Sequence, residues 1–346
     1  MTLITTVRGP IDTSQMGVCL PHEHILNDVT SWWHPTQSLG VDPESFATEL
    51  VTISNVWDLK YDPFGNLDNC RLEDVDLAVN EIRGFRALGG GTIIETTSMG
   101  IGRDLKNLKR ISEETEIHIV AGTGFYLENS QPERIKRLSV DELAELIISD
   151  IREGEGGIRP GIIGEIGVSE DFTEVERVSL AAACGAQRET GLPIQIHLPG
   201  WFRLGDEVLD YVERFGVDPN CVVLCHMGPS GHDRTYQRRL ADRGAWIQYD
   251  MIGAELFYAD QQVQCPSDEE NAHNILELLH EGYGHRILIS SDIFLKSLLR
   301  RFGGPGYAHI LQYFVPRLKR IGVTPEEIDQ LLILNPKTLF EICEEQ

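Results

Sequence analysis

The chain has 346 residues, of which 41% are hydrophobic and 24% are charged, and its formal net charge is −24. A chain of this length and composition can bury a core without disulfides or structural metals, as globular proteins do. An acidic chain repels phosphate backbones and anionic lipid, which disfavours nucleic-acid and membrane-surface partners.

Two further features bear on the compartment. Residues 1–10 lack the apolar core of a signal peptide, and no run of the sequence is apolar enough to span a bilayer. The seven cysteines are odd in number and contain no CxxC pair, which favours reduced thiols and a cytoplasmic protein. Cys225 adjoins His226, but strand neighbours face opposite sides, so we expect Cys225 to be a buried structural thiol in the layer between strands and helices.

Eight short apolar segments alternate with longer amphipathic segments along the chain. The apolar segments are typical of parallel strands covered on both faces; they are residues 17–20, 91–96, 118–122, 161–164, 193–196, 221–224, 245–249 and 287–290. The amphipathic segments between them include residues 72–88, 140–153, 174–189, 206–215, 236–243, 271–281 and 308–321. This alternation predicts an α/β fold, either a closed barrel or a long doubly wound sheet. No GxGxxG motif follows the first strand, so a dinucleotide-binding half is not supported.

Five of the eight predicted strands end in a histidine or a carboxylate. The residues concerned are His22, His24, Glu165, His197, His226 and Asp292. In a barrel these strand ends meet at one mouth, where active sites lie. His22 and His24 are two residues apart and would share a face, whereas Glu23 would point away. Imidazole and carboxylate groups bind zinc and similar ions, and six donors suffice for two ions bridged by a carboxylate.

Each donor also has an ordinary structural explanation. A buried histidine is more often a hydrogen-bonded core residue, and an aspartate after a strand often caps a helix. Five such positions at one barrel mouth favour metal binding over these separate explanations. The remaining histidines lie at strand starts, in helices or in loops, and we expect them to be structural or solvent-facing: His34, His118, His232, His273, His280, His285 and His309.

The sequences around the donors resemble the phosphotriesterase-related family of the amidohydrolase superfamily. The matching segments are Pro21-His22-Glu23-His24, Gly122-Thr123-Gly124-Phe125-Tyr126, Gly164-Glu165-Ile166-Gly167, Gln195-Ile196-His197, His226-Met227-Gly228, Ser291-Asp292 and Gly303-Gly304-Pro305-Gly306-Tyr307. The resemblance covers nearly the whole chain. It implies that His22 and His24 bind the more buried ion with Asp292, that His197 and His226 bind the more exposed ion, and that Glu165 bridges them. The best-known members use a carboxylated lysine as the bridge, so the glutamate here resembles a glutamate-bridged subgroup.

We therefore predict a single (β/α)8 TIM barrel over residues 1–346, with a loop insertion near 55–70 and a substrate loop near 251–270. The expected cofactors are two divalent ions per chain, Zn²⁺ in the first place and Mn²⁺ or Co²⁺ as alternatives. A homodimer is an alternative to a monomer.

The predicted reaction is hydrolysis of a carboxylic ester or lactone by a hydroxide that bridges the two ions. Asp292 would bind one ion, accept a proton and pass it to the leaving group. Tyr126, after the third strand, either donates a hydrogen bond to the oxygen that gains charge or only lines the pocket.

The charge pattern bears on the substrate. Residues 244–285 contain no lysine or arginine, so a phosphate group would lack a cationic partner in the predicted substrate loop. Arg203, Lys296, Arg300 and Arg301 could supply one, although surface charges are the simpler interpretation. The expected substrate contacts are Trp201, Arg203, Phe257, Tyr258 and Phe294, which would make the mouth mainly apolar.

Three alternatives stay open. An organophosphorus ester hydrolase and a phosphorylated-sugar lactonase share the metal site with the favoured ester or lactone hydrolase. A catalytically silent metal-binding barrel is the non-enzyme alternative, and the complete donor set, with Asp292 present, argues against it.

Overall fold

The computed structural model describes residues 2–36 and 40–344. Eight parallel strands form the central sheet, and their order in the sheet is their order in the chain. They are β3 (Val18–Glu23), β6 (Gly90–Glu95), β7 (His118–Thr123), β8 (Ile162–Gly167), β9 (Ile194–His197), β10 (Val222–Leu224), β11 (Trp246–Tyr249) and β14 (Ile287–Ile289). Backbone hydrogen bonds from Asp292 N to His22 O and from His24 N to Ile293 O, each 3.3 Å, bring the ends of the first and last strands together. The sheet is thus nearly closed, and the predicted barrel is confirmed.

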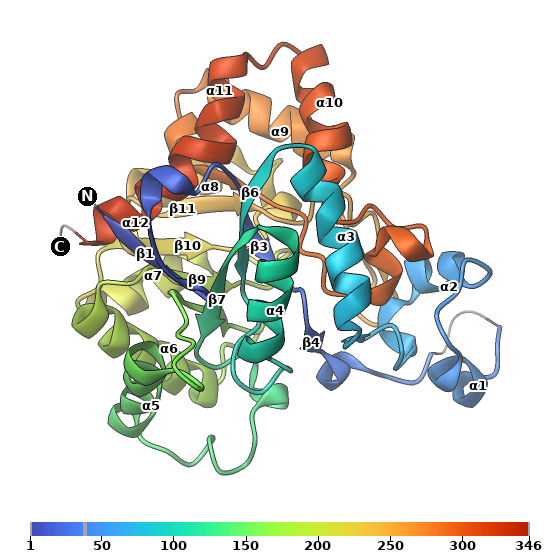
Figure 1. The fold of residues 1–346 in the computed structure, drawn as a ribbon, viewed down its shortest axis with the longest axis horizontal. Helices are drawn as coiled ribbons and strands as arrows, with labels where there is room; N and C mark the ends of the chain where they lie inside the picture. Colours follow the sequence, from blue (N-terminus) through green and yellow to red (C-terminus); the bar gives the residue numbers. More distant parts are fainter. Residues whose placement is uncertain (1, 37–39, 345–346) are drawn as a thin grey trace.

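Helices surround the sheet (Figure 1). They are α1 (Pro43–Thr48), α2 (Val56–Tyr61), α3 (Val75–Ala87), α4 (Leu105–Thr115), α5 (Val140–Glu153), α6 (Glu174–Thr190), α7 (Gly205–Arg214), α8 (Arg234–Asp242), α9 (Asp268–His280), α10 (Val315–Arg320), α11 (Pro325–Asp329) and α12 (Asn335–Glu344). Their boundaries follow local chemistry: α5 begins at the Ser139–Glu142 capping box, and α6 ends at Gly191 in the left-handed conformation. None of the helices in the described part of the chain has the length and hydrophobicity that a membrane span requires.

Alternate strand residues face the two sides of the barrel wall. Ile93, Ile119 and Ile163 belong to the large core between strands and helices. Their neighbours Ile94, Val120 and Ile162 form a separate apolar cluster inside the barrel. Both faces of each strand are therefore buried, which explains why the strands read as continuous apolar runs.

The two segments expected to be loops contain short elements. Residues 55–70 include α2 and a 3-10 turn at Pro63–Gly65, and residues 251–270 include the hairpin of β12 (Phe257–Tyr258) and β13 (Val263–Gln264). The ring of Tyr61 lies 5.0 Å from that of Phe257, and Phe64 lies 5.0 Å from Tyr258. A second short pairing joins β4 (Asn27–Asp28) to β5 (Arg71–Leu72). The two segments therefore pack against each other beside the mouth.

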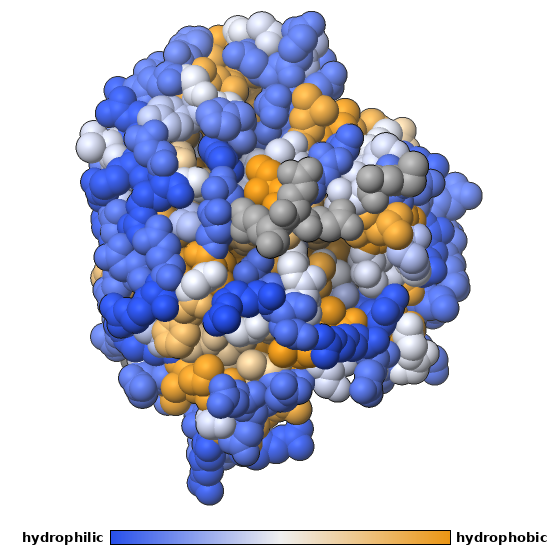
Figure 2. Space-filling view, turned by 90° about the vertical axis from the view of Figure 1, so that its left-hand side faces the viewer, coloured by the Kyte–Doolittle hydropathy of each residue, from blue (hydrophilic) through white to orange (hydrophobic). Residues whose placement is uncertain are grey.

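The opposite end of the barrel holds both chain ends (Figure 1). The antiparallel pair β1 (Leu3–Thr6) and β2 (Gly9–Asp12) and the helix α12 lie there. Figure 2 shows that this face is mostly hydrophilic, with small separate hydrophobic patches.

A disulfide joins Cys221, before β10, to Cys343 in α12. The expectation of seven reduced thiols is wrong for this pair, because residues 122 positions apart in sequence have Cα atoms only 5.5 Å apart in the fold. Five cysteines are free and buried: Cys19, Cys70, Cys184, Cys225 and Cys265.

Candidate metal centre

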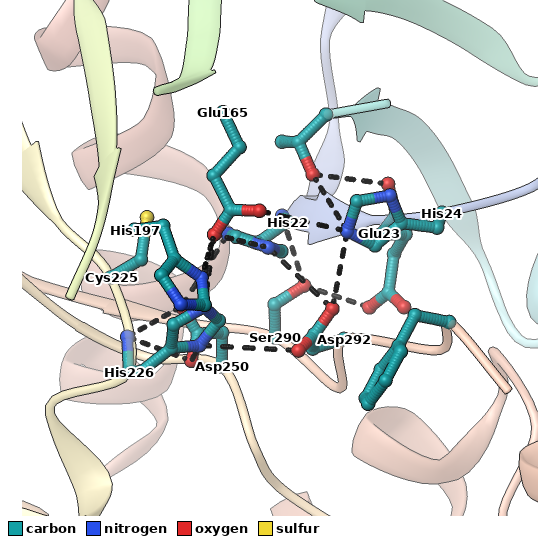
Figure 3. A network of polar contacts seen from close by, with 12 residues as sticks. His22, Glu23, His24, Glu165, His197, Cys225, His226, Asp250, Ser290 and Asp292 are labelled. Carbon is teal, nitrogen blue, oxygen red and sulfur yellow. Dashed lines mark hydrogen bonds and ion pairs between the residues drawn. The ribbon is translucent and has the colours of Figure 1, made fainter. Parts of the chain in front are cut away.

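All six predicted donors lie together at the carboxyl ends of the strands (Figure 3). His22 belongs to β3, Glu165 to β8 and His197 to β9. His24 directly follows β3, whereas His226 and Asp292 lie just beyond the ends of β10 and β14. His226 and Asp292 have positive φ angles, of 58° and 46°. Such backbone is unfavourable for residues with a Cβ atom and recurs at functional sites.

The orientation of Cys225 corrects one expectation. Cys225 is buried as predicted, but it faces the barrel interior beside Val223 and Trp246 instead of the helices. By simple alternation His226 would then face the helix layer. The left-handed backbone at His226 breaks the alternation and directs its ring into the mouth.

His22, His24 and Asp292 form the first group of donors. Oδ1 of Asp292 lies 3.5 Å from His22 Nε2 and 3.4 Å from His24 Nε2. At metal–ligand distances of about 2.0–2.2 Å, tetrahedral geometry separates neighbouring donors by roughly 3.3–3.6 Å. His22 Nε2 and Asp292 Oδ1 are buried without a hydrogen-bond partner among the described residues. This group therefore fits a divalent ion.

Glu165, His197 and His226 form the second group. Oε1 of Glu165 lies 3.1 Å from His197 Nδ1 and 2.9 Å from His226 Nε2. The same carboxylate also faces the first group, with Oε1 3.7 Å from His22 Nε2 and Oε2 3.9 Å from His24 Nε2. Glu165 thus lies between the two groups, where a bridging ligand would be needed.

Asp250 is a residue of the candidate metal centre that the sequence analysis did not single out. It directly follows β11, and its carboxylate accepts hydrogen bonds from the backbone N of His226 and lies 2.9 Å from His226 Nδ1. A carboxylate on one ring nitrogen fixes the ring and leaves Nε2 free to bind a metal. The signal was present in the sequence, because Asp250 is one more acidic residue at the end of a predicted strand.

Other outer contacts orient His22 and His24. The Gln248 amide lies 2.8 Å from His22 Nδ1. The hydroxyl of Thr97 lies 2.8 Å from His24 Nδ1 and donates a 2.5 Å hydrogen bond to Glu95. Each of these histidines therefore has its Nδ1 held and its Nε2 directed to the centre.

The centre concentrates buried carboxyl groups. Its carboxylates are Glu23, Glu95, Glu165, Asp250 and Asp292, all of them buried. No lysine or arginine in the described ranges forms an ion pair with any of them. Buried carboxylates require compensating charge or hydrogen bonds. Two divalent ions would supply the missing positive charge.

The pKa shifts follow from this burial. Burial raises the pKa of Glu23 and that of Glu95 to about 7, and it raises the pKa of Asp292 well above its usual value. Burial also opposes ionisation of Glu165, but the neighbouring His197 and His22 outweigh it and hold the pKa of Glu165 well below its usual value. The pKa of Glu165 thus shifts in the direction opposite to those of Glu23, Glu95 and Asp292.

A cavity of about 350 Å³ opens above the donors. Its aromatic wall consists of Trp32, Phe64, Tyr126, Trp201, Phe202, Tyr258 and Phe294. The acidic residues Glu170, Asp171 and Asp260 also line it, and no lysine or arginine does so among the residues that the structure describes. The cavity therefore suits an apolar, uncharged group.

Two of the expected substrate contacts do not reach this cavity. Phe257 packs against Tyr61, because Phe257 and Tyr258 are strand neighbours and face opposite sides. The Arg203 guanidinium lies 3.4 Å from Asp233 and stacks over the ring of Tyr236, which holds it away from the cavity. Trp201, Tyr258 and Phe294 line the wall, and their contact with a substrate stays a prediction.

The chain was compared with known proteins. A model of the phosphotriesterase family matches residues 2–340. The N-acetyltaurine hydrolase of Tetraodon nigroviridis is 34% identical over 340 residues, 96% of either chain. The phosphotriesterase-related protein of Nematostella vectensis is 35% identical over 96% of this chain and 97% of its own.

Solved structures agree with these matches. The resiniferatoxin-binding protein from Rhodobacter sphaeroides superimposes with a TM-score of 0.95 at 48% identity, covering 98% of this chain and 95% of its own. The lactonase Lmo2620 from Listeria monocytogenes, at 23% identity and a TM-score of 0.80, covers 98% of this chain and 99% of its own and shows the same fold. On this evidence the chain belongs to the phosphotriesterase family.

Proposed function

We propose that the protein is a two-metal hydrolase that cleaves a carboxylic ester or lactone whose other groups are uncharged. One observation carries the proposal: two groups of donors are joined by Glu165, and all six donors except His22 line an aromatic cavity. When bound, two divalent ions make water more acidic and polarise the scissile carbonyl.

Asp292 and Tyr126 have the chemistry that the reaction needs beside the ions. The Asp292 carboxylate lines the cavity floor and can accept the proton of the attacking water, then give it to the leaving group. Burial raises the pKa of Tyr126 well above its usual value, so its hydroxyl stays protonated. That hydroxyl lies 3.3 Å from His197 Nδ1 and can donate a hydrogen bond to the oxygen that gains charge.

The surroundings of the cavity support an uncharged substrate. Lys296 is paired with Asp68, and Arg203 is paired with Asp233, so neither basic side chain is available to a phosphate in the cavity. The acidic side chains in its wall would repel an anion, more strongly in a partly desolvated pocket than in water. Burial of an apolar acyl or alkyl group contributes about 25 cal/mol per Å².

An N-acyl amide is a second candidate substrate class, because relatives named N-acetyltaurine hydrolase match 96% of this chain. The same attack of a water-derived hydroxide on a planar carbonyl group hydrolyses an amide. N-acetyltaurine itself carries a sulfonate, and the cavity wall offers it no basic partner. We therefore rank a neutral amide above an anionic one for this chain.

The test combines metal analysis with a matched substrate panel. Elemental analysis should find two divalent ions per chain, and reconstitution should not depend on bicarbonate, because Glu165 needs no carboxylation. The kcat/KM should be higher for a sugar lactone than for the same lactone with a terminal phosphate, and higher than for a phosphotriester. One ion or none after reconstitution with Zn²⁺, Mn²⁺ or Co²⁺ would refute the metal centre. A clear preference for the phosphorylated lactone would refute the substrate class.

A further inference from the structure

The barrel has a seam between its first and last strands. Among the described residues, β3 and β14 are the two ends of the sheet order and form no ladder with each other. Glu23, the last residue of β3, lies at the mouth end of this seam and is fully buried. Its position between His22 and His24 gave no sign of a role, since its side chain points away from theirs.

The Glu23 carboxylate binds the segment that carries Asp292 (Figure 3). Its Oε1 accepts hydrogen bonds from Ser290 Oγ at 2.8 Å and from Ser291 N at 2.9 Å. Its Oε2 accepts a hydrogen bond from Ile293 N at 2.9 Å. The peptide N–H groups directly before and after Asp292 are therefore both held by one side chain.

Asp292 needs such support. Its φ of 46° is a left-handed conformation, which costs more than right-handed backbone for a residue with a Cβ atom, although aspartate adopts it more readily than most residues do. In this conformation its Oδ1 lies within 3.5 Å of Nε2 of both His22 and His24. Relaxation of the turn would move the carboxylate relative to both histidines.

We propose that Glu23 is a positioning residue for Asp292, because it holds the strained turn from both sides. The expected effect on kcat rests on the proposed function, whereas the expected effect on metal affinity does not. Glu95, the other buried glutamate of the centre that is not a predicted metal donor, has a different target: it binds Ile25 N and the hydroxyl of Thr97, and so acts on His24.

The variant Glu23→Gln keeps the size of the side chain but replaces one acceptor oxygen with an NH₂ group. That group would face an N–H or O–H donor, and at least one of the three hydrogen bonds is lost. Substitution of such outer residues typically costs about 10–100-fold in activity or metal affinity. We expect a fall of that size in kcat with KM unchanged. Zinc titration of the apoprotein should show weaker binding of one ion.

A double variant separates positioning from general support of the barrel. If Glu23 acts through Asp292, Glu23→Gln should cause little further loss of kcat in an Asp292→Asn background. If it acts only by closing the barrel, the two losses should multiply, which would overturn the proposal. Full kcat together with unchanged zinc affinity in the single variant would also overturn it.

Two controls keep the result interpretable. Glu176, a buried glutamate that binds the N–H groups of Ser169 and Thr173, provides the matched variant Glu176→Gln, which should lower Tm but leave zinc affinity within about twofold, because Glu176 contacts none of the six donors. If Glu23→Gln does not fold, Ser290→Ala removes one of the three donors, and the same double-variant comparison with Asp292→Asn applies to it. If the wild type hydrolyses no member of the panel, the proposed function fails. Zinc affinity still decides the positioning role in that case.

Discussion

The two ends of the barrel differ in what fills them. At the carboxyl end of the strands, the interior holds four histidines and five buried carboxylates, and the backbone is left-handed at His226 and Asp292. At the other end, the interior is apolar and is closed by residues such as Ile4, Met16 and Phe340, and by a disulfide to α12. Stability and chemistry thus occupy separate ends of one sheet.

The difference has an energetic cause. Buried carboxylates and strained backbone oppose folding unless cations and hydrogen bonds compensate them. Burial of apolar surface favours folding by about 25 cal/mol per Å². The apolar end can therefore hold the mouth in a conformation that the mouth alone would not keep. Substitutions at the two ends should consequently separate activity from stability.

The largest effect is expected from Asp292→Asn. The amide keeps the shape of the side chain but cannot accept and return a proton, and help of this kind is worth about 10²–10⁴-fold. We expect kcat to fall by that factor while much of the metal and the Tm are retained. Steady-state kinetics, metal analysis and calorimetry measure the three quantities. A loss of kcat below about tenfold would place the proton transfer at another residue.

A smaller effect is expected from Asp250→Asn. The amide cannot accept from both the backbone N and Nδ1 of His226 as the carboxylate does, so the His226 ring loses its fixed orientation. Metal affinity or activity should fall by about 10–100-fold. Excess zinc in the assay should restore much of the activity, because the defect is in binding. Unchanged zinc affinity and unchanged kcat together would contradict the role of Asp250.

The smallest effect on activity is expected at the opposite end. Cys343→Ser removes the disulfide to Cys221 and should lower the free energy of unfolding by about 2–4 kcal/mol. The kcat/KM on the best substrate should stay within about twofold of the wild type. A reducing agent should lower the Tm of the wild type and not that of the variant. If Cys343→Ser instead abolished activity in a folded protein, the separation between the two ends would not hold.

The grouping of the candidate metal donors could be predicted because parallel strands impose a simple rule. All their carboxyl ends meet at one mouth, so residues such as Glu165 and His197 could be grouped without knowledge of the three-dimensional structure. The two-residue spacing of His22 and His24 placed both side chains in the same mouth. Asp250 obeys the same rule and could have been found by it.

The side-chain directions outside regular strands could not be predicted. Alternation placed Cys225 on the wrong side, because the left-handed backbone at His226 is a property of the folded turn. Arg203 could not be excluded from the cavity until Asp233 was seen beside it. The pairing of Cys221 with Cys343 likewise depends on where α12 docks.

The sequence by itself determined the alternation of strands with helices and the strand-end positions of the six candidate donors, because apolar periodicity and position along the chain are local properties. The choice of a barrel over a doubly wound sheet came from the family resemblance, not from the periodicity. Only the tertiary structure decided how the seam between β3 and β14 is joined, where Glu23 acts, and which side chains form the cavity wall. These depend on contacts between residues far apart in the chain. Glu23 lies more than 260 positions from the hydroxyl and backbone N–H groups with which it forms hydrogen bonds, and no local pattern encodes such a contact.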